Sequence, residues 1–132
     1  MDHARTSALK RIRLNLARSK DHPEGSSRHG YEFVAPLDAA GRIDLDAWRE
    51  SRSACTVRRF WGDEAPETGR LVHRAGGSQG ATWVFDYNAA DTDDDEAGFR
   101  FADHAFQPGE YVSIRDDDGA LHTFQVVTVD KA

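Results

Sequence analysis

Three histidines with metal-ligating side chains, His73, His104 and His122, lie in or beside segments that have the residue pattern of β-strands. Imidazole nitrogens ligate zinc and iron, and a three-histidine site leaves open positions for water or substrate. The spacings of 31 and 18 residues contain no HxH or HxxxH pair, so convergence would depend entirely on strand register. Separate histidines that form hydrogen bonds at the rim of a barrel are the simpler interpretation.

The GGSQG segment at residues 76–80 matches the G-x-S-x-G pattern of the nucleophile elbow in serine hydrolases. That elbow requires a strand before the serine and a helix after it, because the serine lies on a sharp turn at the helix N-terminus. Here the following residues, ATWVF, have a strand pattern instead. We therefore expect a glycine-rich hairpin loop.

Five carboxylates occupy six positions at residues 91–96. An EF-hand calcium loop needs glycine at its sixth position and a bidentate glutamate at its twelfth. Counted from Asp93 the twelfth residue is His104, and counted from Asp91 the sixth is Glu96, so neither frame fits. The segment is predicted to be a solvated acidic loop, with weak cation binding as the alternative.

Cys55 is the only cysteine, and it lies close in sequence to Arg58 and Arg59, whose charges could lower the pKa of the thiol. A buried cysteine that packs as a small apolar residue is the favoured interpretation. A single cysteine excludes an intrachain disulfide and fits a reducing compartment, so we expect the protein to be cytoplasmic.

Arginines are combined with aromatic residues in the RRFW segment of residues 58–61, and Arg11 and Arg13 occupy an earlier predicted strand. Proteins that bind single-stranded nucleic acids use this combination, with aromatics stacking on bases and arginines contacting phosphates. The chain is acidic, however, and most aromatics alternate as core residues do, on two strand faces: Trp83, Phe85 and Tyr87, and Phe99 and Phe101. Nucleic acid is therefore disfavoured as a partner.

The net charge of −6 is unevenly distributed along the chain. Residues 1–59 carry 12 Lys and Arg against 8 Asp and Glu, a net +4, and residues 60–132 carry 5 against 15, a net −10. Basic side chains in the first strand can pair with carboxylates of a neighbouring strand. Since Ile12, Leu14 and Leu16 should face the core, we expect Arg11 and Arg13 on the solvent face near such carboxylates.

The 132 residues suffice for one domain with a single hydrophobic core. No apolar run is long enough to span a membrane, and the first residues lack the apolar core of a signal peptide. We expect residues 1–8 to be a flexible N-terminus and residues 9–132 to form one β-rich domain.

Period-2 alternation and β-branched or aromatic residues predict short strands at residues 11–17, 31–35, 55–61, 70–74, 81–87, 98–102, 110–115 and 121–129. A polar segment at residues 19–30 is predicted to be a loop, and Pro36 to end the second strand. Asp44 can cap one short helix near residues 44–53, with Ile43 and Trp48 placed for a hydrophobic staple. The expected fold is mainly β, a small antiparallel β-barrel or sandwich of about seven to eight short strands with one short helix.

The stretches CTVRRFW, GGSQGATWVFDY, DDDEAGFRF, PGEYVSI and HTFQVVTV resemble a small group of bacterial hypothetical proteins of unknown function. The resemblance covers most of the chain from residue 30 onward. It implies a bacterial source, and no activity is assigned to that group.

The residues give no nucleophile–base pair, no paired carboxylates and no metal ligands at diagnostic spacing, which favours a non-catalytic binding or interaction module. Its partner would be a protein or small-molecule ligand that the sequence leaves unknown, without a cofactor and without a membrane. The alternative is a small metal-binding enzyme or sensor with His73, His104 and His122 in the site. A third hypothesis is single-stranded nucleic-acid binding through the basic N-terminal third. We expect a monomer or weak homo-oligomer.

Overall fold

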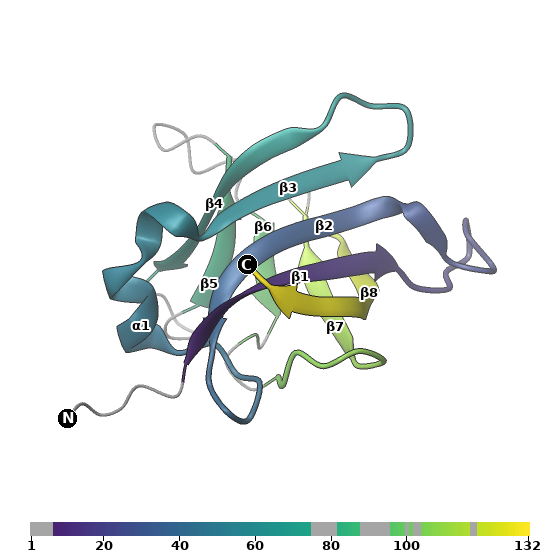
Figure 1. Ribbon diagram of the computed structural model, residues 1–132. Coiled ribbons are helices and arrows are strands. Elements are labelled where there is room, and N and C mark those ends of the chain that lie inside the picture. The colour runs from purple at the N-terminus through teal and green to yellow at the C-terminus, as the bar shows by residue number, and fades with distance from the viewer. Residues whose placement is uncertain (1–6, 75–81, 88–95, 100, 102–103, 117–118) are drawn as a thin grey trace.

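The computed structural model describes residues 7–74, 82–87, 96–99, 101, 104–116 and 119–132, and in these residues eight antiparallel strands form a closed barrel (Figure 1). Each strand pairs with the next one in the sequence, and β8 pairs with β1 to close the barrel. The strands are β1 (Ala8–Leu16), β2 (Ser26–Leu37), β3 (Thr56–Trp61), β4 (Glu67–Arg74), β5 (Thr82–Asp86), β6 (Glu96–Phe99), β7 (Tyr111–Arg115) and β8 (Leu121–Lys131). The fold is therefore a barrel and not a sandwich.

The predicted helix is present but shorter than residues 44–53. Helix α1 (Leu45–Glu50) begins after Asp44, whose Oδ1 accepts a hydrogen bond of 3.1 Å from the backbone N–H of Ala47. This is the expected side-chain cap. A separate 3₁₀ helix, Arg52–Ala54, then leads into β3. None of the helices in the described part of the chain is long and apolar enough to span a membrane.

Strand β2 is longer at both ends than the predicted segment 31–35. It begins at Ser26, inside the predicted loop of residues 19–30, and continues through Pro36 to Leu37. The proline is tolerated because its carbonyl accepts a hydrogen bond from the backbone N–H of Asp44, on the side of β2 that faces away from β1. The missing N–H therefore does not interrupt the pairing of β2 with β1. The prediction that Pro36 ends the strand is wrong.

Three predictions fall wholly or partly outside the described residues. The glycine-rich loop at residues 76–80 lies outside them, as do residues 91–95 of the acidic run and residues 1–6 of the terminus. Within the segment predicted to be flexible, Ala8 begins β1, and the hydroxyl of Ser7 donates a hydrogen bond to the Asp44 carboxylate. Glu96, the last carboxylate of the acidic run, belongs to β6 and is only 5% exposed, so the prediction of a solvated loop is wrong for this residue.

Side chains fill the interior of the barrel, as in other small eight-stranded barrels. Phe33 lies at the centre, with its ring centroid 5.2 Å from that of Phe85 and 5.7 Å from that of Phe106. The predicted alternation in β1 is confirmed, because Ile12, Leu14 and Leu16 are buried in this core. Trp83 and Phe85 are buried as well, as is Phe101, whereas the side chain of Phe99 lies outside the described set.

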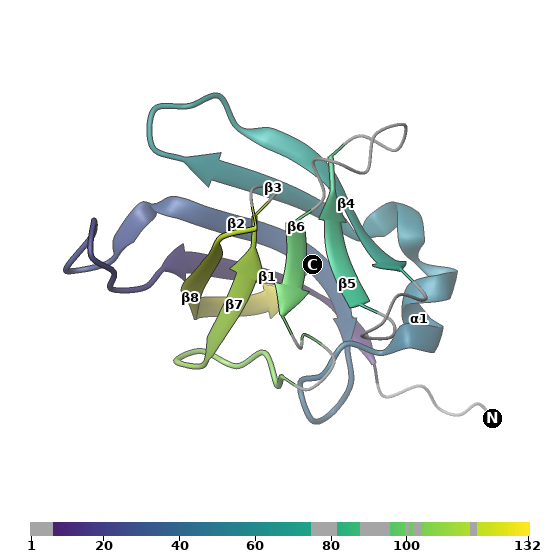
Figure 2. The ribbon, with the colours of Figure 1, turned by 180° about the vertical axis from the view of Figure 1, so that it is seen from behind.

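The two ends of the barrel differ in chemistry. Figures 1 and 2 show α1 at one end of β2 and β3, and the β1–β2 and β3–β4 loops at their other end. At the α1 end, the Trp48 indole N–H donates to the carbonyl of Leu71 at 2.9 Å and the surroundings are apolar. At the end with the two loops, called the mouth from here on, the polar side chains of Tyr31, Arg59 and Glu96 lie together beside Trp61.

Candidate functional site

Two neighbouring rows of side chains cross the outer face of β1 to β4. In the first row, Arg13 of β1 is directly opposite Glu32 of β2, which is opposite Arg58 of β3, and Arg58 is opposite Thr68 of β4. Because side chains of a strand alternate between its two faces, all four point away from the core. The row therefore combines two cations, one anion and one hydroxyl.

The second row lies next to the first, two residues along each strand. Arg11 of β1 is opposite Val34 of β2, and Thr56 of β3 is opposite Arg70 of β4. Arg11, Thr56 and Arg70 are exposed, whereas Val34 is 4% exposed. This row adds two guanidinium groups and a second hydroxyl to the same outer face.

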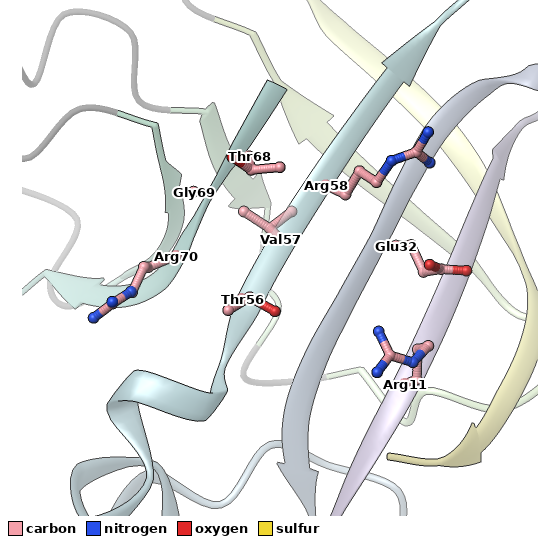
Figure 3. Close-up of a pocket in the computed structure, with 8 residues that line it drawn as sticks. All are labelled: Arg11, Glu32, Thr56, Val57, Arg58, Thr68, Gly69 and Arg70. Atoms are coloured by element: carbon pink, nitrogen blue, oxygen red, sulfur yellow. The ribbon is translucent and has the colours of Figure 1, made fainter. Parts of the chain in front are cut away.

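A groove of about 500 Å³ runs between these rows (Figure 3). Volumes of about 300–1,000 Å³ are typical of small-molecule sites. We call it the arginine groove and define it by its lining residues: Arg11, Glu32, Thr56, Val57, Arg58, Thr68, Gly69 and Arg70. Figure 3 shows Arg11, Glu32, Thr56 and Arg58 side by side over β1 to β3, with Thr68 and Arg70 on β4. Four strands thus contribute to one site.

Gly69 allows the close strand packing on the β4 side of the groove. A Cβ atom at this position would lie 2.3 Å from the backbone oxygen of Asp86, which is closer than any real contact. Any side chain at Gly69 would therefore push β4 away from β5. The glycine keeps Thr68 and Arg70, which flank it in sequence, in line with β3.

Ion pairing separates the groove arginines from the other arginines of the barrel. The Arg13 guanidinium lies 3.9 Å from the Glu32 carboxylate and 4.4 Å from the Phe60 ring centroid, which confirms the predicted cross-strand pair for Arg13. Among the residues that the structure describes, Arg11, Arg58 and Arg70 have no carboxylate within 4.0 Å of their guanidinium groups. Arg11 is exposed and lies opposite Asp130 of β8 in register, as expected, but the two side chains do not come within the 4.0 Å of an ion pair.

The side chains of the groove are suited to binding an anion. Guanidinium groups present planar N–H pairs that match the oxygens of phosphate and carboxylate groups, and threonine hydroxyls both donate and accept. The lining residues include no histidine, cysteine, serine or lysine. The Thr56 and Thr68 hydroxyls and the Glu32 carboxylate are the groups of this lining that could act as a nucleophile or a base.

A second polar cluster lies inside the barrel at the mouth and is centred on Glu96. The hydroxyls of Tyr31 and Tyr87 donate hydrogen bonds of 3.0 Å and 2.8 Å to Glu96 Oε1. Arg59 Nε is 3.6 Å from Glu96 Oε2, close enough for an ion pair but too far for a hydrogen bond. The Nε atom is buried and has no hydrogen-bond partner among the residues that the structure describes.

Arg59 links this cluster to the rim of the mouth. Its Nη1 atom is 3.4 Å from Glu67 and 3.6 Å from Glu64, and its guanidinium lies 4.6 Å from the Trp61 ring centroid. The groups of the cluster therefore bind mainly to one another. Burial raises the pKa of both tyrosine hydroxyls, which keeps them protonated as donors to Glu96.

Burial also raises the pKa of the Glu96 carboxyl, while the two tyrosine hydrogen bonds and Arg59 act in the opposite direction. The folded state thus holds the Glu96 proton more tightly than the unfolded chain. This contribution to stability is complete below the unfolded-state pKa of about 4.3 and is lost as the pH rises through the folded-state pKa.

We therefore expect the free energy of unfolding of the wild type, minus that of Glu96→Gln, to fall as the pH rises from about 4 to 8. Urea unfolding of both proteins across this range measures the difference, and the comparison removes the effect of all other titrating groups. A difference that grows with pH would show that the folded state favours the ionised carboxylate instead.

The three histidines of the metal-site hypothesis take separate partners. The ring centroid of His73 is 4.7 Å from Trp83, and Trp48 packs nearby at the α1 end. His122 Nε2 lies 2.9 Å from the Asp116 carboxylate, and its ring is 6.0 Å from Trp61 at the mouth. His73 is six residues along β4 from Glu67 at the mouth, which corresponds to about 20 Å.

His104 follows β6 and donates its backbone N–H to the carbonyl of Phe101. Within the described part of the chain, no group of three or more His, Cys, Asp or Glu side chains could hold a metal ion. The positions of the histidines therefore do not support a shared site for His73, His104 and His122.

Cys55 is fully buried, and burial raises the pKa of its thiol to about 11. A thiol with a raised pKa is a poor nucleophile at neutral pH. The prediction of a buried, packed cysteine is confirmed, and burial raises the pKa of its thiol instead of the nearby arginines lowering it.

Sequence reasoning found part of the groove and missed the mouth cluster. It placed Arg11 and Arg13 on the outer face but did not associate Glu32 or Arg70 with them, because strands far apart in sequence meet only through register. The alternation of Trp83, Phe85 and Tyr87 was the available signal that Tyr87 points inward. Glu96 carried no such signal, because it follows five acidic or polar residues.

A comparison of the chain with protein-family models, curated proteins and solved structures finds no match. Its function is therefore inferred from the geometry of its own side chains.

Proposed function

We propose that the protein is a non-catalytic binding module and that the arginine groove takes a small ligand bearing a phosphate group. The observation that carries the proposal is the set of three groove arginines without a carboxylate partner in the described residues, Arg11, Arg58 and Arg70. Exposed cations placed together repel one another, and a bound anion relieves this repulsion. The groove is thus electrostatically complementary to an anion, although the whole chain carries a net charge of −6.

The spacing of the arginines sets the size of the ligand. Neighbouring strands lie about 4.8 Å apart, so the backbones of β1 and β4 are separated by about 14 Å across the groove. In Figure 3 the guanidinium groups of Arg11 and Arg58 lie on the two sides of Glu32, whereas that of Arg70 is directed away from them. An anion that contacts all three guanidinium groups must be larger than inorganic phosphate, and the groove volume of about 500 Å³ has room for it.

The direct test is calorimetric titration of the purified protein with inorganic pyrophosphate at low and moderate salt. We expect binding that weakens as salt increases, because the contacts are exposed to solvent. Hydrogen bonds to charged groups contribute about 1.5–3 kcal/mol each, so Arg58→Ala and Arg70→Ala should each weaken binding by about tenfold or more. Arg42→Ala, which removes an exposed arginine outside the groove, should leave the affinity unchanged.

Equal effects of Arg58→Ala and Arg42→Ala, or no binding at low salt, would contradict the proposal. Labelled single-stranded DNA belongs in the same titration series, because Arg11 and Arg13 also fit the nucleic-acid hypothesis. Phe60, however, is only 9% exposed beneath Arg13 and Arg58 and does not offer a free stacking surface. If the protein bound DNA at micromolar concentrations, and if replacing both Arg11 and Arg13 by alanine abolished that binding, nucleic acid would replace the small molecule as the proposed ligand.

The cellular setting is part of the same proposal. A buried single cysteine is compatible with a reducing cytoplasm, and we propose a bacterial cytoplasmic protein that works as a monomer or weak homo-oligomer. No cofactor or catalytic step is required for binding in the groove.

A further inference from the structure

We propose that Glu32 makes the arginine groove selective for phosphate esters of hydroxylated molecules, such as sugar phosphates, over inorganic phosphate. This inference rests on the proposed function and adds the class of ligand. The feature behind it is a carboxylate placed among cations: Glu32 lines the groove together with Arg11, Arg58 and Arg70. A site built only to hold an anion would gain affinity without that carboxylate.

Glu32 is placed to contact a ligand. Its side chain is 31% exposed, and its only described ion pair, with Arg13, is long at 3.9 Å. Figure 3 shows its carboxylate on the outer face between the side chains of Arg11 and Arg58. A carboxylate accepts hydrogen bonds and donates none, so it can take hydroxyl groups and repels phosphate oxygens.

Figure 3 indicates the places for the two parts of such a ligand. The guanidinium group of Arg70 is directed away from Glu32 and Arg58, whereas those of Arg11 and Arg58 lie on either side of the Glu32 carboxylate. The phosphate therefore fits at the Arg58 guanidinium. The hydroxylated part then lies over β2, where Glu32 accepts hydrogen bonds from its hydroxyl groups.

The simpler role for Glu32 is neutralisation of Arg13 and Arg58, its register partners on both sides. The two roles predict different responses to the substitution Glu32→Gln. Under neutralisation alone, loss of the negative charge strengthens the binding of every anion by a similar factor. Under the proposal, inorganic phosphate gains affinity, whereas a sugar phosphate loses the charge-assisted hydrogen bond from its hydroxyl.

The experiment is calorimetric titration of the wild type, Glu32→Gln and Glu32→Ala with inorganic phosphate and with ribose 5-phosphate. We expect the wild type to prefer ribose 5-phosphate by about tenfold or more. Both substitutions should weaken the binding of ribose 5-phosphate by about tenfold and strengthen the binding of inorganic phosphate. Glu110→Gln, at an exposed glutamate outside the groove, should change neither affinity.

A gain of similar size for both ligands in Glu32→Gln would overturn the inference and leave the proposed function intact. No binding of either ligand by the wild type would overturn both. Adenosine 5′-monophosphate, titrated in parallel, tests whether the sugar phosphate that binds is free or is part of a nucleotide. Tighter binding than ribose 5-phosphate supports a nucleotide as the ligand, and equal binding supports a free sugar phosphate.

Discussion

Replacement of Glu96 by alanine should lower the free energy of unfolding by about 3 kcal/mol. The substitution removes the acceptor of the Tyr31 and Tyr87 hydroxyls and leaves them inside the barrel without a partner. It also leaves Arg59, whose Nε atom is buried, without the carboxylate nearest to that atom. Loss of one member of a buried charged cluster is strongly destabilising because the other members stay desolvated. Urea unfolding followed by circular dichroism measures the change.

The matched control is Glu96→Gln, which keeps the size of the side chain and an oxygen that can accept from a tyrosine hydroxyl. It should be clearly less destabilising than alanine at neutral pH. If the alanine variant lost less than about 1 kcal/mol, the mouth cluster would behave as an exposed set of ion pairs, whose contributions are of that size. The account of a buried polar network would then be wrong.

Phe33→Ala should be at least as destabilising, with a loss of about 3–5 kcal/mol. Phe33 is fully buried, and its ring contacts those of Phe85, Phe101 and Phe106. These neighbours come from different parts of the chain and cannot all collapse into the space that the ring leaves. The loss therefore includes a cavity as well as the transfer of the ring to water. Chemical denaturation gives its size.

Tyr111→Ala serves as the comparison for Phe33→Ala, because Tyr111 is also aromatic but is 56% exposed on β7. Its removal should change the free energy of unfolding by about 0.5 kcal/mol or less. Similar losses in the two variants would mean that the centre of the barrel is not a packed core.

The local rules of sequence were sufficient for the mainly β fold with one short helix, and they left barrel and sandwich as alternatives. Alternation of Ile12, Leu14 and Leu16 with Arg11 and Arg13 predicted both the strand and its two faces, since one side of β1 had to be apolar. Asp44 predicted the start of α1 because its side chain competes for backbone N–H groups. Features that depend on residues a few positions apart were therefore predictable.

Features that depend on pairing between distant strands were not. The arginine groove joins Arg11 to Arg70, and the mouth cluster joins Tyr31 to Glu96, across 59 and 65 residues of sequence. Neither pair has a local signal, because only the register of the intervening strands brings its members together. Pro36 and Glu96 were misassigned for a related reason. The register of β2 with β1 turns the side of Pro36 that lacks an N–H away from β1, and strand pairing brings the Tyr31 and Tyr87 hydroxyls to Glu96.

The mouth cluster and the arginine groove also differ in what they leave for a ligand. In the mouth, Arg59 is surrounded by Glu64, Glu67 and Glu96, and both tyrosine hydroxyls already have an acceptor. In the groove, the guanidinium groups of Arg11, Arg58 and Arg70 have no carboxylate partner within the described residues. The outer face of the barrel is therefore the better candidate for binding, and the mouth cluster the better candidate for holding the fold together.

The most direct test of ligand binding in the groove is a titration of ¹⁵N-labelled protein with ribose 5-phosphate, followed by amide chemical shifts. The account predicts that the largest shifts occur at the lining residues of β1 to β4, including Glu32, Arg58 and Arg70, and that they are absent in Arg58→Ala. Shifts centred instead on Trp61 and His122 at the mouth, or no shifts at millimolar ligand, would contradict it.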